Sequence, residues 1–512
     1  MADQLAAPVL PVHGHPLVKT PNLSRLAARG VVFDNAYCSY PLCAPSRFSL
    51  LAGRLPSAIG AYDNAAEFAS SIPTFVHHAR AAGYRTCLSG KMHFVGADQL
   101  HGFEERLTTD VYPADFGWTP DWENGVLAYD WSHHMASVIE AGPCHRSLQI
   151  DFDEETVHQA VQKIYDYGRT AGDAPFFLTV SFTHPHDPFN CLPEHWDLYD
   201  HADIDLPSVP PIPPERQDPH SRRLHHMDGL HRYDLTDERV RTARHAYYGS
   251  VSYVDELVGR LLTALERAGL ADDTIVIFTG DHGEMLGERG MWYKMTFFEW
   301  SARVPLLIHA PGRWAPGRVS APVSHLDLFP TLLDLFGDRA PPPVDPLDGE
   351  SLLPLLNGDG RDGDRTVFAE YLGEGALTPA FMARRGRYKY IVGGGDPPQL
   401  YDLEADPREL VNLAGTPEVA ETEAALAEAV VRRWDAQALR QAVIESQKRR
   451  LFVHKVLLTG RHTPWDFQPH RNAATAYVRN FGVAEDTLKA LARLPSAEPV
   501  PPDFPDARPI LP

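Results

Sequence analysis

Three times in the first three quarters of the chain, a helical pattern is followed by a short β-rich run and then by a cluster of polar residues. The predicted pairs of helix and strand cover residues 74–82 and 84–88, 154–168 and 175–182, and 243–268 and 274–279. Helices and strands that alternate in this way predict a mainly parallel sheet covered by helices on both faces. The polar clusters at 89–93, 183–188 and 280–283 follow the carboxyl ends of these strands. Because ligand sites in open α/β sheets lie at that edge, we expect the three clusters to form one site.

The chain is long enough for two or three structural units, since it has 512 residues and a domain usually has ~100–200. Residues 203–222 are rich in proline and polar residues and read as a long surface excursion. Antiparallel strands are expected near 367–372, 387–392 and 399–403, and an amphipathic helical pattern covers 417–459. The expected units are 1–340, an α/β unit with a large mixed, mainly parallel sheet; 341–415, a smaller α+β subdomain with an antiparallel sheet; and 416–512, a helical region with a tail that contacts other subunits.

The charge balance excludes several classes of partner. Basic residues number 47 and acidic residues 68, which gives a formal net charge of −21. A chain this acidic is not expected to coat nucleic acid or an anionic membrane surface, although a local basic site for a small anion is compatible with it. No run approaches the ~20 apolar residues that span a bilayer.

Five cysteines, odd in number and widely spaced, fit neither a disulfide framework nor a paired zinc site. The first residues lack the pattern of a signal peptide. We therefore expect a cytoplasmic protein with reduced thiols.

Cys43 stands where a helix is expected to begin. The segment from Leu42 to Arg47, LCAPSR, precedes a helical pattern, and proline and serine just inside a helix start favour this assignment. Backbone N–H groups and the helix dipole favour an anion at such a position. Two interpretations follow from the residues alone: a nucleophile above an anion-binding site, or a small buried cysteine in an ordinary first turn.

Five separated motifs resemble the signatures of type I sulfatases in the alkaline phosphatase superfamily, and the resemblance covers nearly the whole chain. They are Cys43-Ala-Pro-Ser-Arg47, Gly90-Lys-Met-His93, Pro185-His-Asp-Pro188, Gly280-Asp-His-Gly283 and Lys294 in Met291-Trp-Tyr-Lys294. Taken singly, each has an ordinary alternative: Lys91 could be a solvated lysine, His186 a hydrogen-bonded loop histidine and Asp281 part of a capped turn. Their joint position after predicted strands favours the functional interpretation.

The resemblance implies a modified cysteine and a metal ion. In that family the cysteine is converted to Cα-formylglycine, so a formylglycine-generating maturation enzyme is an expected partner. Mostly oxygen ligation favours a hard divalent ion, for which we expect Ca²⁺, with Mg²⁺ and Mn²⁺ as alternatives. The implied metal ligands are Asp3, Asp281, His282 and an oxygen of the modified Cys43. The implied catalytic residues are Cys43, Arg47, Lys91, His93, His186 and Lys294.

By the same resemblance, the formylglycine is hydrated to a gem-diol, and one hydroxyl, polarised by the metal, attacks sulfur. The alcohol leaves with a proton from His186, assisted by Lys294. His93 then takes a proton from the second hydroxyl, and sulfate is expelled as the aldehyde reforms. The charge that develops on the leaving oxygen needs fixed positive charge, which Arg47, the two lysines and the metal would supply.

Within this family, several local strings resemble the choline-sulfatases, among them YPADFGW at 112–118, EYLGEG at 370–375 and TPWDFQP at 463–469. The implied substrate is choline-O-sulfate, whose quaternary ammonium needs aromatic faces and a carboxylate. The expected contacts are Trp118, Glu370 with Glu374 as second choice, Asn64 and His134. The alternative for Trp118 is an ordinary core tryptophan.

The choline-sulfatase resemblance also implies a homo-oligomer, a dimer or tetramer, whose tail packs on a neighbouring subunit. Trp465 and Phe467 lie in a Pro-rich tail that suits such an interface. The alternative is a tail folded back on its own subunit.

The chain departs from the family pattern at its first residues. Family members open with a hydrophobic strand before the first metal-binding aspartate, whereas Met1-Ala-Asp3 begins inside that element. We therefore expect Asp3 at a frayed terminus, with weak metal binding. Two rival functions stay open: a phosphonate or phosphate ester hydrolase or broader aryl or alkyl sulfatase of the same superfamily, and a catalytically impaired protein that binds choline-like or sulfated compounds.

Overall fold

The computed structural model describes residues 1–125, 135–170, 174–358, 365–461, 465 and 493. Two hydrogen-bonded sheets form its central layer, with strand orders β3-β2-β5 and β10-β1-β8-β7, and β9 also pairs with β1. The strands are β1 (Val31–Tyr37), β2 (Arg85–Gly90), β3 (Glu105–Arg106), β5 (Phe176–Ser181), β7 (Val276–Thr279), β8 (Arg303–His309), β9 (Gly317–Val319) and β10 (Val323–Ser324); β4 (Gly142–Pro143) and β6 (Asn190–Cys191) pair separately.

The first residues of the chain join the two sheets. Ala2 forms parallel bridges with Phe182, just past β5, and with Gly280, just past β7. The Met1 amino group donates a hydrogen bond to Val180 O, 2.8 Å away. In the central layer, β8 runs antiparallel to its neighbours β1 and β7, whereas the pairs that β1 forms with β9 and β10 and that β2 forms with β3 and β5 are parallel. The predicted mixed, mainly parallel sheet is therefore confirmed.

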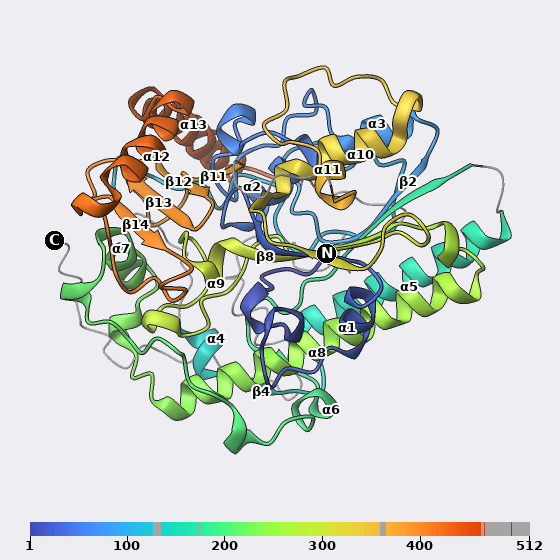
Figure 1. Ribbon diagram of the computed structural model, residues 1–512, viewed down its shortest axis with the longest axis horizontal. Coiled ribbons are helices and arrows are strands. Elements are labelled where there is room, and N and C mark those ends of the chain that lie inside the picture. The colour runs from blue at the N-terminus through green and yellow to red at the C-terminus, as the bar shows by residue number, and fades with distance from the viewer. Residues whose placement is uncertain (126–134, 171–173, 359–364, 462–464, 466–492, 494–512) are drawn as a thin grey trace.

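Helices cover this layer on both faces (Figure 1). The long helices α5 (Leu148–Arg169) and α8 (Asp237–Arg267) lie on one face, together with α1 (Pro21–Ala27), α4 (Ala136–Ile139) and α6 (Pro193–Trp196). The other face carries α2 (Cys43–Ala52), α3 (Phe75–Ala81), α10 (Leu328–Phe336) and α11 (Leu353–Leu356). The three predicted pairs of helix and strand are observed as α3 and β2, α5 and β5, and α8 and β7.

Alternation along β8 shows how the sequence assigns the two faces. Leu306 and Ile308 belong to the apolar core on the α2 and α10 side, whereas Leu307 belongs to the core on the α8 side. Successive side chains of a strand point to opposite faces, and both faces of this strand are buried. This explains why β8 reads as a continuous apolar run rather than as an alternating one.

A second, antiparallel sheet follows in the order β11-β12-β13-β14. Its strands are Thr366–Tyr371, Ala380–Arg385, Tyr388–Gly393 and Gln399–Asp402, and the helices that follow are α12 (Ala420–Arg433) and α13 (Ala436–Leu457). The three predicted strands are present, and β12 is one that the sequence reading missed. Phe381 of β12 packs with Leu426 and Val430 of α12 in a small separate core. The proposed boundaries near 340 and 415 stay predictions.

The segment 203–222 is more than a surface excursion. Val209 within it is buried. Its N–H donates to Glu288 Oε2 at 2.8 Å, and its carbonyl accepts from Arg289 N at 2.9 Å. The segment therefore packs on the loop that leads to Lys294 and ends in α7 (Pro219–Met227). The helices of the described residues include none that combines the length and apolarity needed to cross a membrane.

Candidate active site

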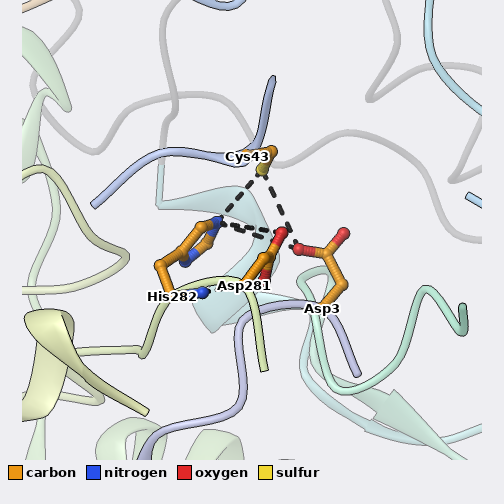
Figure 2. A group of neighbouring side chains, drawn as sticks. All are labelled: Asp3, Cys43, Asp281 and His282. Carbon is orange, nitrogen blue, oxygen red and sulfur yellow. Dashed lines mark hydrogen bonds and ion pairs between the residues drawn. The ribbon is translucent and has the colours of Figure 1, made fainter. Parts of the chain in front are cut away.

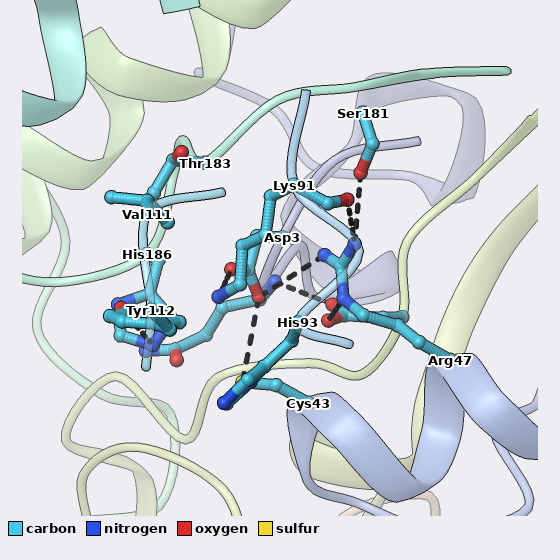
Figure 3. Close-up of polar contacts among 12 residues, drawn as sticks. Asp3, Cys43, Arg47, Lys91, His93, Val111, Tyr112, Ser181, Thr183 and His186 are labelled. Atoms are coloured by element: carbon cyan, nitrogen blue, oxygen red, sulfur yellow. Dashed lines mark hydrogen bonds and ion pairs between the residues drawn. The ribbon is translucent and has the colours of Figure 1, made fainter. Parts of the chain in front are cut away.

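The three polar clusters meet at one edge of the central layer, as their position after β2, β5 and β7 predicts. A single side chain, that of Arg47 in α2, links them. Its NH1 group donates to Lys91 O at 2.6 Å and to Ser181 Oγ at 2.9 Å, and its Nε donates to Asp281 Oδ2 at 2.8 Å (Figure 3). These contacts join the ends of all three strands to the start of α2.

Cys43 is the first residue of α2 and is buried, after an extended Leu42. Its Sγ lies 3.1 Å from His282 Nε2 and 3.8 Å from Asp3 Oδ1. Burial, followed by the charge of Lys91, sets a pKa for the Cys43 thiol of about 12. The thiolate, not the thiol, is the nucleophile, so the unmodified side chain is poorly suited to attack at neutral pH.

Four buried side chains form a group with the geometry of a metal site (Figure 2). One ligand atom from each of Asp3, Cys43, Asp281 and His282 lies within 4.8 Å of all the others. His282 Nδ1 lies 2.9 Å from Gly283 O, which can only accept, so Nδ1 carries the hydrogen and Nε2 presents its lone pair to the group. Burial lowers the pKa of His282 to about 3, which keeps the imidazole neutral. Two carboxylates and a neutral imidazole suit a divalent cation.

The two carboxylates differ in their surroundings. Burial, together with the charge of Asp281, raises the pKa of Asp3 to about 6. Burial also acts to raise the pKa of Asp281, but the Arg47 guanidinium and the charge of His282 hold it well below its usual range. A cation between them would remove the repulsion that these two carboxylates otherwise feel.

The expectation of a frayed Asp3 is wrong. Its side chain is 0% exposed and forms ion pairs with Lys91 and, at 3.7 Å, with Arg47 NH2. The bridges of Ala2 to both halves of the central layer fix the backbone immediately before it. Asp3 is thus held as rigidly as the ligands contributed by the strand ends.

Lys294 and His186 form a hydrogen-bonded pair beside this group. Lys294 Nζ lies 3.0 Å from His186 Nε2 and donates to Gln4 Oε1 at 2.6 Å. His186 Nδ1 lies 2.8 Å from Asp187 O. Both side chains are buried, at 2% and 3% exposure, so the positive charge of Lys294 acts in a medium that screens it little.

His93 and its neighbours show a contribution that the sequence reading missed. Tyr112 lies among the predicted site residues: its ring is 5.0 Å from that of His93 and 5.7 Å from that of His186, and Lys91 Nζ stands 3.8 Å from its centroid. Asp110 accepts hydrogen bonds from the backbone N–H groups of Met92 and His93. The only signal for Tyr112 was its place at the start of a family-like string.

Gln4 and Glu284 are two further residues that the sequence reading did not select. Gln4 Nε2 donates to Glu284 Oε2 at 2.5 Å while its Oε1 accepts from Lys294. The other oxygen of Glu284 accepts from the N–H groups of Leu286 and Tyr293, at 2.8 and 2.7 Å. Glu284 therefore orients both Gln4 and the loop that carries Lys294, which a single sequence could not reveal because the contacts are long-range.

Of the residues predicted to contact an ammonium group, two lie beside the catalytic residues. Asn64 Oδ1 accepts from Ala44 N at 3.0 Å, next to Cys43. The Trp118 ring is 5.5 Å from the His93 ring and 5.1 Å from the Tyr112 ring. His134 lies outside the described residues.

The first-choice carboxylate, Glu370, is fully engaged elsewhere. It accepts hydrogen bonds from the backbone N–H and the hydroxyl of Ser57, and from Trp434 Nε1 at 2.7 Å. Glu374 is equally buried, but neither of its carboxylate oxygens has a hydrogen-bond partner. Burial, opposed in part by the charge of Lys294, raises the pKa of Glu374 to about 7. The second choice therefore fits an unpaired cation better than the first.

The tail is described at one position that bears on its predicted role. The ring of Trp465 lies 5.1 Å from that of Phe116, edge to face, within the same chain. Phe467 lies outside the described residues. The contact of Trp465 corresponds to the alternative in which this part of the tail folds back.

Three family models match the chain. One described as sulfatase matches residues 1–338, one for the C-terminal part of N-sulphoglucosamine sulphohydrolase matches 287–435, and one for the C terminus of choline sulfatase enzymes matches 441–494. The matches together span most of the sequence, including the helix α13.

Relatives of known name agree with these matches. The chain is 48% identical to a choline-sulfatase of Rhizobium meliloti strain 1021 over 505 residues, 97% of this chain and 98% of the relative. It is 29% identical to an arylsulfatase of Clostridium perfringens over 444 residues, 82% of this chain and 90% of the relative. The crystal structure of a phosphonate monoester hydrolase of Agrobacterium radiobacter superposes with a TM-score of 0.68 at 26% identity, covering 86% of this chain and 94% of that one.

Proposed function

The chain belongs to the sulfatase family, and from that premise we propose that it hydrolyses choline-O-sulfate to choline and inorganic sulfate. The observation that carries this proposal is the 48% identity to a choline-sulfatase over 97% of the chain. The arrangement of buried cations around Cys43 supports the same reaction, because a sulfate ester is an anion that gains charge on its leaving oxygen as the S–O bond breaks.

Two groups that the family uses fit the residues present. Asp3, Asp281, His282 and the side chain at Cys43 would hold a divalent metal ion, for which we propose Ca²⁺. When bound, it would act as a Lewis acid towards the nucleophile and the sulfate oxygens. Conversion of Cys43 to Cα-formylglycine, followed by hydration, would supply two hydroxyl groups in place of a thiol with a pKa of about 12.

The chain's own residues account for binding and proton transfer. Lys91 and Lys294 bind the sulfate oxygens, and Arg47 keeps Asp281 ionised and oriented through its Nε hydrogen bond of 2.8 Å. The pair formed by His186 Nε2 and Lys294 Nζ shares one hydrogen bond and delivers a proton to the leaving alcohol oxygen. His93, whose turn is fixed by Asp110, takes the proton whose removal releases sulfate.

The alcohol end of the substrate determines specificity. A quaternary ammonium donates no classical hydrogen bonds, so it is bound by aromatic faces and negative charge. Trp118 supplies the face, and Glu374 supplies a carboxylate whose oxygens are not used within the protein. Asn64 completes this set, which we call the ammonium-binding set: Asn64, Trp118 and Glu374. Glu370 is replaced in this proposal because Ser57 and Trp434 use its oxygens.

A second candidate activity is hydrolysis of phosphonate monoesters. The similarity to the Agrobacterium radiobacter enzyme, with a TM-score of 0.68 over 86% of this chain, favours it. The same cations would neutralise a phosphonate ester, whereas the ammonium-binding set would have no role. Relative kcat/KM values for choline-O-sulfate and a phenyl phosphonate monoester distinguish the two activities.

The test combines peptide mass spectrometry across Cys43 with turnover assays on protein made in a formylglycine-competent host. We expect the Cys43 peptide to show replacement of sulfur by oxygen with loss of two hydrogens. We also expect choline-O-sulfate to be cleaved with a higher kcat/KM than methyl sulfate, 4-nitrophenyl sulfate or the phosphonate. An unmodified thiol in an active enzyme would overturn the nucleophile assignment, and preference for another ester would overturn the substrate.

The proposal requires a formylglycine-generating enzyme as the maturation partner. We also infer a homo-oligomer in which part of the C-terminal tail contacts a neighbouring subunit, although Trp465 itself lies on Phe116 of its own chain. Light scattering on full-length protein and on a variant that ends at residue 461 checks this assembly.

A further inference from the structure

Helix α13 reaches from the C-terminal region to the loops around the catalytic centre. Arg450 on this helix is 5% exposed and forms a two-pronged ion pair with Asp63, which is 0% exposed: NH1 lies 2.6 Å from Oδ1 and NH2 2.6 Å from Oδ2. Asp63 Oδ1 also accepts from Ala65 N at 3.0 Å. Arg450 thus holds the turn on which Asn64, a member of the ammonium-binding set, is placed.

The same helix face holds the segment that carries Trp118. Arg450 NH1 donates to Thr119 Oγ1 at 3.2 Å. Gln447, almost one turn earlier, accepts from the backbone N–H of Trp122 at 3.0 Å. Residues 118–122 are therefore anchored at two points to side chains of α13.

A third contact extends this anchoring to Glu374. Trp122, held by Gln447, donates from its indole Nε1 to Gly373 O at 3.1 Å. Gly373 directly precedes Glu374. Each member of the ammonium-binding set is therefore the chain neighbour of a residue that is bonded to α13 or to a residue α13 holds.

Charge arguments indicate why an ion pair is used here. Removing two charges from water costs free energy that their attraction recovers only with good geometry, so buried pairs are retained where they fix an arrangement rather than for stability alone. The two parallel hydrogen bonds of a guanidinium with a carboxylate fix both distance and orientation. Arg450 makes no recorded contact with the sulfate-binding side chains Lys91 and Lys294.

We propose that Arg450 is a positioning residue for substrate specificity. With Gln447, it sets the placement of the three segments that bind the ammonium group, and it has no part in cleavage of the S–O bond. This inference rests on the proposed function, and it adds a role for the C-terminal helix in choosing the alcohol. The partner chemistry it serves is a small cationic alcohol esterified with sulfate.

The experiment compares Arg450→Met and Arg450→Lys with Arg449→Met, a change at the exposed neighbour on the same helix. Each variant is assayed on choline-O-sulfate and on methyl sulfate, which lacks the ammonium group. We expect Arg450→Met to lower kcat/KM for choline-O-sulfate about 10-fold or more, mainly through KM, a loss within the range of a well-placed charged contact. Methyl sulfate turnover should stay within about twofold, Arg450→Lys should lie between, and Arg449→Met should match wild type.

A merely structural role would give a different pattern. Equal losses on both esters, or no loss on either, would overturn the proposal. The double variant of Arg450→Met with Asp63→Asn removes both charges and leaves no unpaired carboxylate. It should keep the choline-specific loss, and full recovery would show that the stranded charge, not the lost contact, caused it.

Two further readouts separate this proposal from the proposed function. Amide hydrogen exchange in Arg450→Met should rise in residues 62–66 and 117–123 and stay unchanged in 88–93; no local rise would contradict the anchoring. If wild-type protein itself does not prefer choline-O-sulfate to methyl sulfate, the proposed function fails, and the specificity role of Arg450 fails with it. A wild-type preference that survives in Arg450→Met overturns the role of Arg450 alone.

Discussion

Two buried glutamates four positions apart have opposite surroundings. Glu370 shares its two oxygens among three donors, whereas both oxygens of Glu374 lack a hydrogen-bond partner. A buried carboxylate without donors is costly unless a ligand pairs with it. This contrast, rather than the sequence, identifies Glu374 as the group that a cation would meet.

The raised pKa of Glu374, about 7, predicts a pH-dependent KM. Burial disfavours the charged form and outweighs Lys294; Asp63 acts in the same direction as burial, and Asp228 also lies in its electrostatic surroundings. Below about 7 the carboxyl is protonated and loses its attraction for the ammonium. We therefore expect KM for choline-O-sulfate to rise as pH falls through this value, and KM for 3,3-dimethylbutyl sulfate, its neutral analogue, to change much less.

The variant Glu374→Gln provides the check. It should raise KM for choline-O-sulfate and abolish the part of its pH dependence that the neutral analogue lacks. A pH profile that survives in Glu374→Gln would assign the dependence to another group. The same sign applies to stability: because the folded-state pKa is raised, the contribution of Glu374 to the free energy of unfolding decreases as pH rises from its ordinary pKa through about 7.

Trp118→Ala tests the aromatic face. A cation over an indole contributes about 0.5–2 kcal/mol, so we expect KM for choline-O-sulfate to rise by roughly 2- to 30-fold. The neutral analogue should lose less, since only the apolar part of its contact is removed. Initial-rate kinetics on both esters measures the difference, and equal losses would count against a cation–π contact.

Most site residues could be predicted because the chemistry of a motif is local, but the unpredicted ones act over long sequence distances. Cys43, Arg47 and the residues after each strand stand in short recognisable strings. Gln4 and Glu284 act through contacts across 280 residues. The choice between Glu370 and Glu374 required knowledge of Ser57 and Trp434, neither of which has a sequence signal for that role.

At the scale of elements, helix α5 holds the loop that carries His186. Asp153 Oδ1 accepts from Thr183 N at 2.7 Å, and its Oδ2 accepts from His184 N at 2.9 Å and lies 2.7 Å from His184 Nδ1. All of these groups are buried. One carboxylate therefore fixes the backbone two residues before the proposed general acid.

Asp153→Asn should reduce kcat with little change in KM. An amide offers one oxygen where the loop needs two acceptors, so one N–H loses its partner and His186 is displaced from the leaving oxygen. Since general acid catalysis contributes ~10²–10⁴-fold, we expect kcat to fall by ~10-fold or more from imperfect placement. The matched control is Asp166→Asn on the same helix, whose side chain is 60% exposed.

A smaller loss with a leaving group that needs no proton would complete this test. For 4-nitrophenyl sulfate, whose phenolate leaves readily, Asp153→Asn should lose less than it does for choline-O-sulfate. Loss of the same size on both esters would point to general damage instead. Wild-type kcat on choline-O-sulfate would refute the positioning role.

Elements were predictable where periodicity is strong and failed where context decides. The helices α5 and α8 have long apolar stripes, and their strands follow directly. Strand β12 was missed, although Phe381 and Met382 are buried in it, because its edges lack clear turn signals. Val209 is buried through contact with Glu288 and Arg289, which no local composition reveals.

At the scale of the whole molecule, the proposed metal ion connects the two halves of the central layer. Its ligands come from the first residues, from the start of α2 and from the end of β7. Metal that binds only the folded state stabilises it, by about 2.7 kcal/mol at a free concentration near 100 Kd. We therefore expect chelation to lower Tm by several degrees.

Calorimetry with and without a chelator measures this shift. Asp281→Asn should have a lower Tm and should respond little to chelator, because one ligand is already lost. Re-addition of Ca²⁺ should restore Tm of the wild type. An unchanged Tm after chelation of metal-loaded wild-type protein would contradict a structural contribution from the metal.

The general architecture was predictable because alternating helices and strands permit few arrangements. What could not be predicted is how the chain closes the layer. Ala2 takes the place between β5 and β7, so Asp3 is buried rather than frayed. The antiparallel direction of β8 is likewise set by its neighbours and not by its own apolar residues.

The enclosure of Cys43 sets a timetable for its maturation. The thiol is 1% exposed, and His282 is the residue nearest to its sulfur among the recorded contacts. During synthesis, residue 281 follows residue 43 by 281 − 43 = 238 positions, which at ~5–20 residues per second takes on the order of 10–50 s. For that interval the wall formed by Asp281 and His282 does not exist, and an enzyme that must grip Cys43 as an extended segment has free access. Once the last strand of the layer docks, that access ends, so the fate of each copy is decided while it is still being made.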